Sequence, residues 1–251
     1  MVAAVFPAAG QGKRMQAGMN KVLLELMGTP ILVRTLLQFS RSQYIGHLIV
    51  SVAQEEVSFI RHLLRRVSGL KPVTVVAGGS ERQYSIANGL RALPEETDIV
   101  LVHDAARPLI SVETIDAVIE AARTVGGGIA AVPAKSTMKI VSDERLVVQT
   151  PPRETVWEVQ TPQGFRRDIL LAAYEKAEQD GYLGTDDSCL VERLNVPIRV
   201  VESSYRNIKI TTPEDILIAE TLLRAEKDGM GALVRKAAEH AKSKLKDKLM
   251  R

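Results

Sequence analysis

Cysteine is almost missing from this sequence, because Cys189 is the only one in 251 residues. One cysteine can form neither an intrachain disulfide nor a cysteine-based metal cluster, so we interpret Cys189 as a small buried apolar side chain. The four histidines, His47, His62, His103 and His240, do not have the spacing of metal ligands. Neither a disulfide-stabilised domain nor a Cys/His metal site is therefore expected.

Long hydrophobic runs are absent as well. No window approaches the roughly 20 consecutive apolar residues of a membrane-spanning helix, and residues 1–7 lack the basic start and the length of a signal peptide. The fractions of hydrophobic residues, 45%, and charged residues, 25%, are ordinary for a globular protein. We expect a cytoplasmic protein without membrane contact, with residues 1–227 forming one domain.

The net charge of +3 is not spread over the whole chain. Residues 228–251 contain seven Lys or Arg and three Asp or Glu, a net charge of +4, so residues 1–227 carry a net charge of −1. The main domain therefore gives no reason to expect nucleic-acid binding. We interpret 228–251 as a basic amphipathic helical tail.

Short apolar runs alternate with helical patterns over most of the chain, which is typical of βαβ units and a largely parallel sheet. Strands are expected near 2–7, 47–52, 72–76, 98–103, 129–133 and 198–202. Helices are expected near 31–40, 54–67, 81–93, 112–125, 166–180 and 213–227. Ser80-Glu81-Arg82-Gln83 has the form of a capping box, and Thr212-Pro213 places proline at a first helical position. The sequence predicts a Rossmann-like three-layer α/β fold with a mostly parallel central sheet.

The stretch at about 135–157 interrupts this alternation. Thr137–Val141 and Leu146–Gln149 flank the turn residues Ser142-Asp143-Glu144-Arg145, which predicts a protruding β-hairpin arm. A two-stranded ribbon is only marginally stable alone. We therefore expect the arm to pack on a second subunit, giving a homodimer.

The loop from Ala8 to Met15 follows the first strand and combines small residues with adjacent cations: Ala8-Ala9-Gly10-Gln11-Gly12-Lys13-Arg14-Met15. Small residues let backbone N–H groups approach phosphate oxygens, and cations offset their charge. Lys13 is followed by Arg14 instead of Ser or Thr, which excludes a Walker A loop. Met15 stands where a dinucleotide fingerprint needs Gly or Ala. A triphosphate suits the loop best, although a structural turn explains its glycines equally well.

Other segments at strand ends support a ligand site, because ligands of open α/β sheets bind there. Lys21 is close enough in sequence to act on the same phosphate as Arg14. Asp104 and Arg107 follow an apolar strand, where they suit a magnesium-triphosphate complex and a substrate phosphate, or an ion pair that orders the turn. Gly79 precedes a helix start that suits a base or ribose, or simple capping.

Together these motifs resemble one family of doubly wound nucleotide-diphospho-sugar type nucleotidyltransferases, the 2-C-methyl-D-erythritol 4-phosphate cytidylyltransferases. The resemblance runs from Val2 to about Leu223. It is carried by Pro7-Ala8-Ala9-Gly10-x-Gly12-x-Arg14-Met15, Lys21, Gly78-Gly79-x-x-Arg82-x-x-Ser85, Val102-His103-Asp104-Ala105-Ala106-Arg107-Pro108, Thr137-Met138-Lys139, Thr161-Pro162-Gln163, Thr185-Asp186-Asp187 and Asn207-Ile208-Lys209-Ile210-Thr211-x-Pro213-Glu214-Asp215. Asn20 and Val22 stand beside Lys21 where the family often has Pro and Gln.

The resemblance implies roles for particular residues. The matches to the CTP contacts are Ala8, Ala9, Gly10, Gly79, Ser85 and Ala105, and Gly12, Lys13 and Arg82 lie in the same motifs. Arg14 and Lys21 match the pair that stabilises the α-phosphate. The matches to the sugar-phosphate pocket are Asp104, Arg107, Thr161, Thr185 and Lys209. Thr137 and Arg153 match arm residues that reach the partner subunit's site. Arg14, Lys21, Arg153 and Lys209 are the catalytic candidates.

The implied reaction joins CTP to 2-C-methyl-D-erythritol 4-phosphate in the non-mevalonate isoprenoid pathway and releases pyrophosphate. Mg²⁺ is the expected cofactor, held mainly by the CTP phosphates, with Asp104 as a candidate ligand. A ribitol 5-phosphate cytidylyltransferase is the nearest alternative, and Arg153, Thr137 and Thr185 favour the erythritol substrate. A nicotinamide-dependent oxidoreductase predicts an acid about 20 residues after the glycines, where Gly28-Thr29-Pro30-Ile31 stands instead. A catalytically silent nucleotide-binding module remains open.

Overall fold

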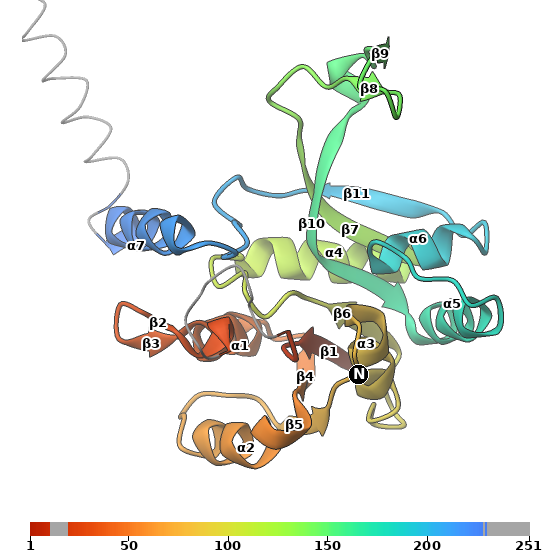
Figure 1. The fold of residues 1–251 in the computed structure, drawn as a ribbon. Helices are drawn as coiled ribbons and strands as arrows, with labels where there is room; N and C mark the ends of the chain where they lie inside the picture. Colours follow the sequence, from red (N-terminus) through yellow and green to blue (C-terminus); the bar gives the residue numbers. More distant parts are fainter. Residues whose placement is uncertain (11–19, 228, 230–251) are drawn as a thin grey trace, which may run out of the picture.

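The computed structural model describes residues 1–10, 20–227 and 229. The predictions for Gly12, Lys13 and Arg14 therefore lie outside the described residues, as does the predicted tail at 228–251 apart from Gly229. The described part is a three-layer α/β structure with a central sheet between two groups of helices (Figure 1). No helix of this part has the length and apolar character needed to cross a bilayer.

The central sheet has seven strands in the order β11-β7-β10-β6-β1-β4-β5. All neighbouring pairs are parallel except those that β10 makes with β6 and β7, which confirms the mostly parallel sheet. The strands are β1 Val2–Pro7, β4 Ile45–Val52, β5 Val73–Ala77, β6 Ile99–Val102, β7 Gly127–Pro133, β10 Trp157–Arg166 and β11 Ile198–Glu202. β10 is an additional strand that the periodicity of the sequence does not predict.

Helices cover both faces of this sheet (Figure 1). They are α1 Ile31–Arg41, α2 Val57–Arg65, α3 Arg82–Leu90, α4 Val112–Val125, α5 Arg167–Gln179, α6 Asp187–Glu192 and α7 Pro213–Lys227. Short 3-10 turns are η2 Lys21–Leu23, η3 Gln54–Glu56 and η4 Arg153–Thr155, and β2 Glu25–Leu26 pairs with β3 Thr29–Pro30. The predicted helices all form, with α6 in addition.

Strand β1 explains why the core has two halves. Its side chains alternate, so that Ala4 and Phe6 pack in one apolar cluster with α1, α2 and α4, whereas Ala3 and Val5 pack in another with α3, α5 and α6. Successive side chains of a strand point to opposite faces, and a strand covered on both faces is apolar throughout. Packing on both faces therefore holds the sheet between its two helix layers, so that the loops at the strand ends start from fixed positions.

Two local predictions are wrong. Ser80 does not cap α3, whose N-cap is Glu81 without a side-chain cap bond. Gln83 does not close a capping box because its amide is used at long range, donating to the Tyr182 carbonyl and accepting from the Gly184 N–H. Cys189 is half-buried, not buried, and its Sγ donates to the Asp186 carbonyl. The prediction of Pro213 at a first helical position is confirmed.

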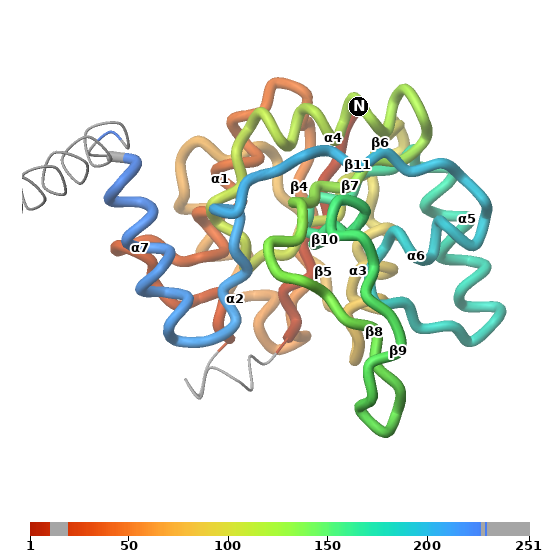
Figure 2. The backbone as a smooth tube through the Cα atoms, turned by 90° about the horizontal axis from the view of Figure 1, so that it is seen from above, coloured from red at the N-terminus to blue at the C-terminus, as the bar shows by residue number. Residues whose placement is uncertain are grey.

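The predicted hairpin arm is present between β7 and β10. β8 Ile140–Val141 pairs antiparallel with β9 Val147–Gln149, and the Ser142 N–H donates to the Leu146 carbonyl across the turn. Both views show the arm extending away from the body of the sheet (Figures 1 and 2). Its apolar side chains are exposed in this chain: Met138, Ile140, Val141, Leu146, Val147 and Val148.

Candidate active site

A cavity of about 180 Å³ lies where β1, β5 and β6 end. The carboxyl ends of parallel strands meet at one edge of a sheet, and ligands of open α/β sheets bind there. The residues predicted for the site that line this cavity are Ala8, Ala9, Gly10, Lys21, Gly79, Arg82, Ser85, Asp104, Ala105 and Lys209. The fold therefore brings together residues as far apart in the sequence as Ala8 and Lys209.

The glycine pair at 78–79 lets two loops approach closely at the cavity wall. A Cβ on Gly78 would lie 2.7 Å from the Ala9 Cβ, and a Cβ on Gly79 would lie 2.5 Å from the Tyr84 Cβ. The Ser85 hydroxyl accepts from the Gly79 N–H at 3.0 Å and donates to the Glu81 carbonyl at 3.0 Å. The Ser85 hydrogen bonds hold this loop on α3, and the missing Cβ of Gly78 lets the loop lie close to the Ala9 side chain.

Asp104 is the centre of a cluster of cations. Its carboxylate lies 2.8 Å from the Lys209 Nζ, 3.4 Å from the Arg82 Nε and 3.5 Å from the Arg107 Nε. The residue is only 8% exposed. Burial alone would raise the pKa of Asp104, but Lys209, Arg82 and Arg107 outweigh it and hold the pKa below its usual range. Asp104 is therefore ionised and orders three cations at the cavity.

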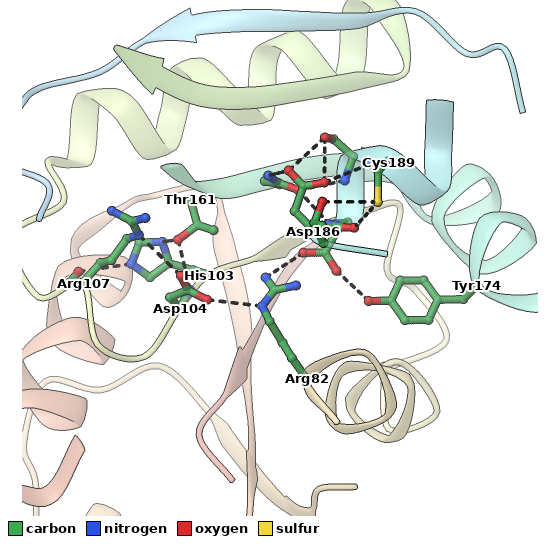
Figure 3. A network of polar contacts seen from close by, with 12 residues as sticks. Arg82, His103, Asp104, Arg107, Thr161, Tyr174, Asp186 and Cys189 are labelled. Atoms are coloured by element: carbon green, nitrogen blue, oxygen red, sulfur yellow. Dashed lines mark hydrogen bonds and ion pairs between the residues drawn. The ribbon is translucent and has the colours of Figure 1, made fainter. Parts of the chain in front are cut away.

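Arg82 connects this cluster to a second buried carboxylate. Its Nη2 lies 2.8 Å from Asp187, which also accepts from the Tyr174 hydroxyl at 2.6 Å (Figure 3). Burial alone would lower the pKa of Arg82, but Asp187 and Asp104 raise it above its usual value. Gln163 holds Asp187 in turn by accepting from its backbone N–H at 3.1 Å. Asp187 and Gln163 stand in the sequence motifs, but the contact between Arg82 and Asp187 joins segments 105 residues apart.

Lys21 reaches the cavity from η2. Its Nζ donates to the Ile210 carbonyl at 3.1 Å, and the Ile210 N–H donates to the Ala106 carbonyl at 2.9 Å. The amine is therefore held between the strand end at Ala106 and the segment that carries Lys209. Lys21 lines the same cavity as Ala8, Ala9 and Gly10.

His103 and Thr161 lie behind the cavity and support Asp104. The His103 Nε2 lies 3.1 Å from the Arg107 carbonyl, which can only accept, so Nε2 carries the proton. Nδ1 of the neutral ring then accepts from the Thr161 hydroxyl at 3.1 Å, and that hydroxyl accepts from the Asp104 N–H at 3.0 Å (Figure 3). The sequence gives His103 no role, but here it orders the turn at 103–107.

Other predicted site residues do not line the 180 Å³ cavity. Arg107 is directed toward the Asn207 carbonyl, to which its Nη1 donates at 2.8 Å, and Thr161 is buried. Thr185 lines an adjoining cavity of about 90 Å³ with Arg82. Thr137 and Arg153 are exposed at the arm and its base. Their predicted contacts with substrate, in this site or in a partner's, stay predictions.

The buried His103 makes stability depend on pH. Burial lowers the pKa of His103 to about 3, whereas an unfolded histidine titrates near 6.5. Between about pH 7 and pH 5 the unfolded chain therefore takes up a proton here that the folded chain does not. The free energy of unfolding should fall by about 2 kcal/mol from this residue alone as the pH falls. We expect His103→Gln to remove this part of the pH dependence in urea denaturation.

His47 provides the matched control for this measurement. Burial also lowers its pKa, but it is only partly buried, so His47→Gln should flatten the profile less. The titration of Asp104 does not contribute to the change between about pH 7 and pH 5, because an unfolded Asp titrates near 3.9. An unchanged pH dependence in His103→Gln would show that the folded His103 is not held neutral.

Comparison with known proteins finds matches that cover most of this chain. A model of the 2-C-methyl-D-erythritol 4-phosphate cytidylyltransferase family matches residues 2–225. The protein of that name from Geotalea uraniireducens is 47% identical over 227 residues, which cover 89% of this chain and 97% of the relative. The one from Geobacillus kaustophilus is 47% identical over 220 residues, covering 88% and 96%.

Solved structures show the same fold. The 4-diphosphocytidyl-2C-methyl-D-erythritol synthase of Anaerococcus prevotii superimposes with a TM-score of 0.80 at 34% identity, covering 89% of this chain and 98% of that one. The 2-C-methyl-D-erythritol 4-phosphate cytidylyltransferase of Thermus thermophilus gives 0.72 at 32% identity, covering 88% and 98%. Because the family model matches residues 2–225 and relatives 47% identical align over most of their own length, this chain belongs to the 2-C-methyl-D-erythritol 4-phosphate cytidylyltransferase family.

Proposed function

We propose that this chain transfers the cytidylyl group of CTP to 2-C-methyl-D-erythritol 4-phosphate, giving 4-diphosphocytidyl-2-C-methyl-D-erythritol and pyrophosphate in the non-mevalonate isoprenoid pathway. The observation that carries the proposal is the cavity that Ala8, Ala9 and Gly10 line together with the cations Lys21, Lys209 and Arg82. Backbone N–H groups and fixed cations are what two phosphate-bearing substrates need in order to approach each other. A cytoplasmic location remains a prediction.

In the proposed reaction a phosphate oxygen of the methylerythritol phosphate attacks the α-phosphorus of CTP. A new P–O bond forms, the bond from the α-phosphorus to the bridging oxygen breaks, and pyrophosphate leaves with that electron pair. A phosphate monoester is already an anionic nucleophile, so no general base is required. Lys21 and Arg14 offset charge at the α-phosphate, and Lys209, ordered by Asp104, orients the attacking phosphate. Arg14 enters through the family resemblance alone.

Nucleotidyl transfer generally uses a divalent metal, and Mg²⁺ is the proposed one. In the part of the chain that the structure describes, no group of three or more His, Cys, Asp or Glu side chains is arranged to hold a metal. The cavity carboxylates there are Glu81 and Asp104, and Asp104 is already paired with cations. This donor set fits a metal held mainly by the CTP phosphates, with Asp104 as the candidate protein ligand. When bound, the metal would neutralise phosphate charge.

Pyrophosphate release tests the proposal directly. The purified chain should release pyrophosphate with CTP, Mg²⁺ and methylerythritol 4-phosphate, and much less with ATP, GTP or UTP in place of CTP. Faster release with ribitol 5-phosphate would instead identify the ribitol enzyme. CTP binding without any pyrophosphate release would identify a silent nucleotide-binding module.

We further propose a homodimer formed through the arm at 135–157. Six apolar side chains of the arm are exposed in this chain, and Val148 is 68% exposed. Exposed apolar groups gathered on one projecting element are typical of a protein interface. In such a dimer, Thr137 and Arg153 would lie at the partner subunit's cavity.

Charged substitutions on the arm should therefore weaken the dimer. We expect Leu146→Asp with Val148→Asp to shift the chain to monomer in analytical ultracentrifugation and to lower the rate of pyrophosphate release, because burying charges at an interface is unfavourable. Leu217→Asp is the control, since Leu217 on α7 is equally exposed, at 68%, but lies away from the arm. A double variant that stays dimeric while keeping its fold would contradict the arm as the interface.

A further inference from the structure

Asn20 lies next to the cavity, is 7% exposed, and uses every polar group of its side chain. Its Nδ2 donates to the Ala8 carbonyl at 2.7 Å and to the Glu56 carboxylate at 2.8 Å. Its Oδ1 accepts from the Val22 N–H at 3.3 Å, which caps η2. A buried amide with all its partners is held in one orientation.

We propose that Asn20 is a positioning residue for the transfer reaction, because its amide fixes Lys21 against the backbone of the nucleotide-binding loop. The proposal rests on the proposed function, in which Lys21 acts at the α-phosphate. Asn20 itself is not among the residues that line the cavity. It acts through Lys21, the next residue in the sequence, which does line the cavity.

Ala8, whose carbonyl accepts from Asn20, is itself held by the central sheet. The Ala8 N–H donates to the Ser51 carbonyl of β4 at 2.7 Å, so Ala8 remains part of the sheet edge. The carbonyl of the same residue accepts from Asn20. One hydrogen bond therefore links β4 to Ala8, a second links Ala8 to Asn20, and a peptide bond links Asn20 to Lys21. At the far end, Lys21 donates to the Ile210 carbonyl.

The partners of Asn20 require a neutral amide. The Ala8 carbonyl and the Glu56 carboxylate are both acceptors, and one NH₂ group can serve the two of them at once. An aspartate here would offer no donor and would face Glu56 with like charge. An alanine would leave both acceptors without this donor. In either case the backbone of η2 loses its connection to Ala8, and the Lys21 amine loses its fixed distance to the loop.

Kinetics on the full chain test this role. We expect Asn20→Asp to lower kcat for pyrophosphate release roughly 10- to 100-fold, since small misplacements of a catalytic group can cost 10²-fold, with KM for CTP little changed. Asn20→Ala should also lower kcat. It introduces no charge, so it tests the same loss of positioning if the Asn20→Asp variant misfolds. Asn195→Asp is the control, because Asn195 is exposed and distant from the cavity. Thermal unfolding by circular dichroism is measured on every variant.

A double-mutant cycle separates positioning from a general structural role. In a Lys21→Met background, Asn20→Asp should change kcat by no more than about twofold, because the cation it positions is gone. A full loss that persists in that background, or an Asn20→Asp variant with native kcat, would overturn the proposal while leaving the proposed function intact. Native kcat in Lys21→Met alone would overturn the proposal, because Asn20 would have no catalytic group to position, whereas absence of pyrophosphate release by the wild type would overturn the proposed function.

Discussion

Replacing Lys21 by alanine should lower kcat for pyrophosphate release by roughly 10²–10³-fold at saturating CTP and methylerythritol 4-phosphate. Lys21 lines the cavity together with Ala8, Ala9 and Gly10, and its Nζ donates to the Ile210 carbonyl. The charge on the α-phosphate grows as the new P–O bond forms. A cation that is already in place stabilises that charge without having to reorganise.

The effect should appear in kcat more than in KM. An interaction that is stronger in the transition state than with bound substrate raises kcat, whereas uniform binding changes KM. Arg14→Ala should behave in the same way if the resemblance is right about its role. Lys176→Ala is the control, because Lys176 pairs with Asp180 on the surface of α5. Near-native turnover of both Lys21→Ala and Arg14→Ala would remove these residues from the mechanism.

Asp104→Asn should be the most destabilising single change at the site. The substitution keeps the size of the side chain but removes the charge that Lys209, Arg82 and Arg107 share. Removing one partner from a buried ionic pair costs up to about 3–5 kcal/mol. The loss here should come mainly from the largely buried Arg107, because Lys209 is partly exposed and Arg82 keeps its ion pair with Asp187. Urea denaturation at neutral pH should show this loss, and turnover should fall because Lys209 is no longer ordered by Asp104.

The pH dependence of the difference checks its electrostatic origin. The cations lower the pKa of Asp104 in the folded chain, so its contribution to stability is complete above about pH 4, where an unfolded Asp is ionised. The contribution decreases as the pH falls below that value. The wild type and Asp104→Asn should therefore converge in acid. Asp168→Asn, at an exposed carboxylate, should have little effect, and a constant difference at all pH values would point to packing instead of charge.

Strand β10 shows why part of the fold could not be predicted. Its buried positions include Gln160, Thr161 and Gln163, so the usual alternation of apolar and polar residues is missing. These side chains are buried because they find polar partners: Gln160 accepts from Asn207, and Gln163 donates to Asp186. Such partners come from distant segments, and no local pattern reveals them. The capping box failed for the same reason, because Gln83 bonds to Tyr182 and Gly184.

Local sequence patterns are enough to predict the alternation of strands and helices, the arm, and the short motifs that follow the strands. Apolar periodicity and turn residues act over a few positions, so they can be recognised along the chain. Only the tertiary structure decided that Arg82 would connect Asp104 to Asp187, that His103 would be neutral, and that Asn20 would join Lys21 to Ala8. Burial and charge at these groups depend on segments far apart in sequence, and packing alone brings those segments together.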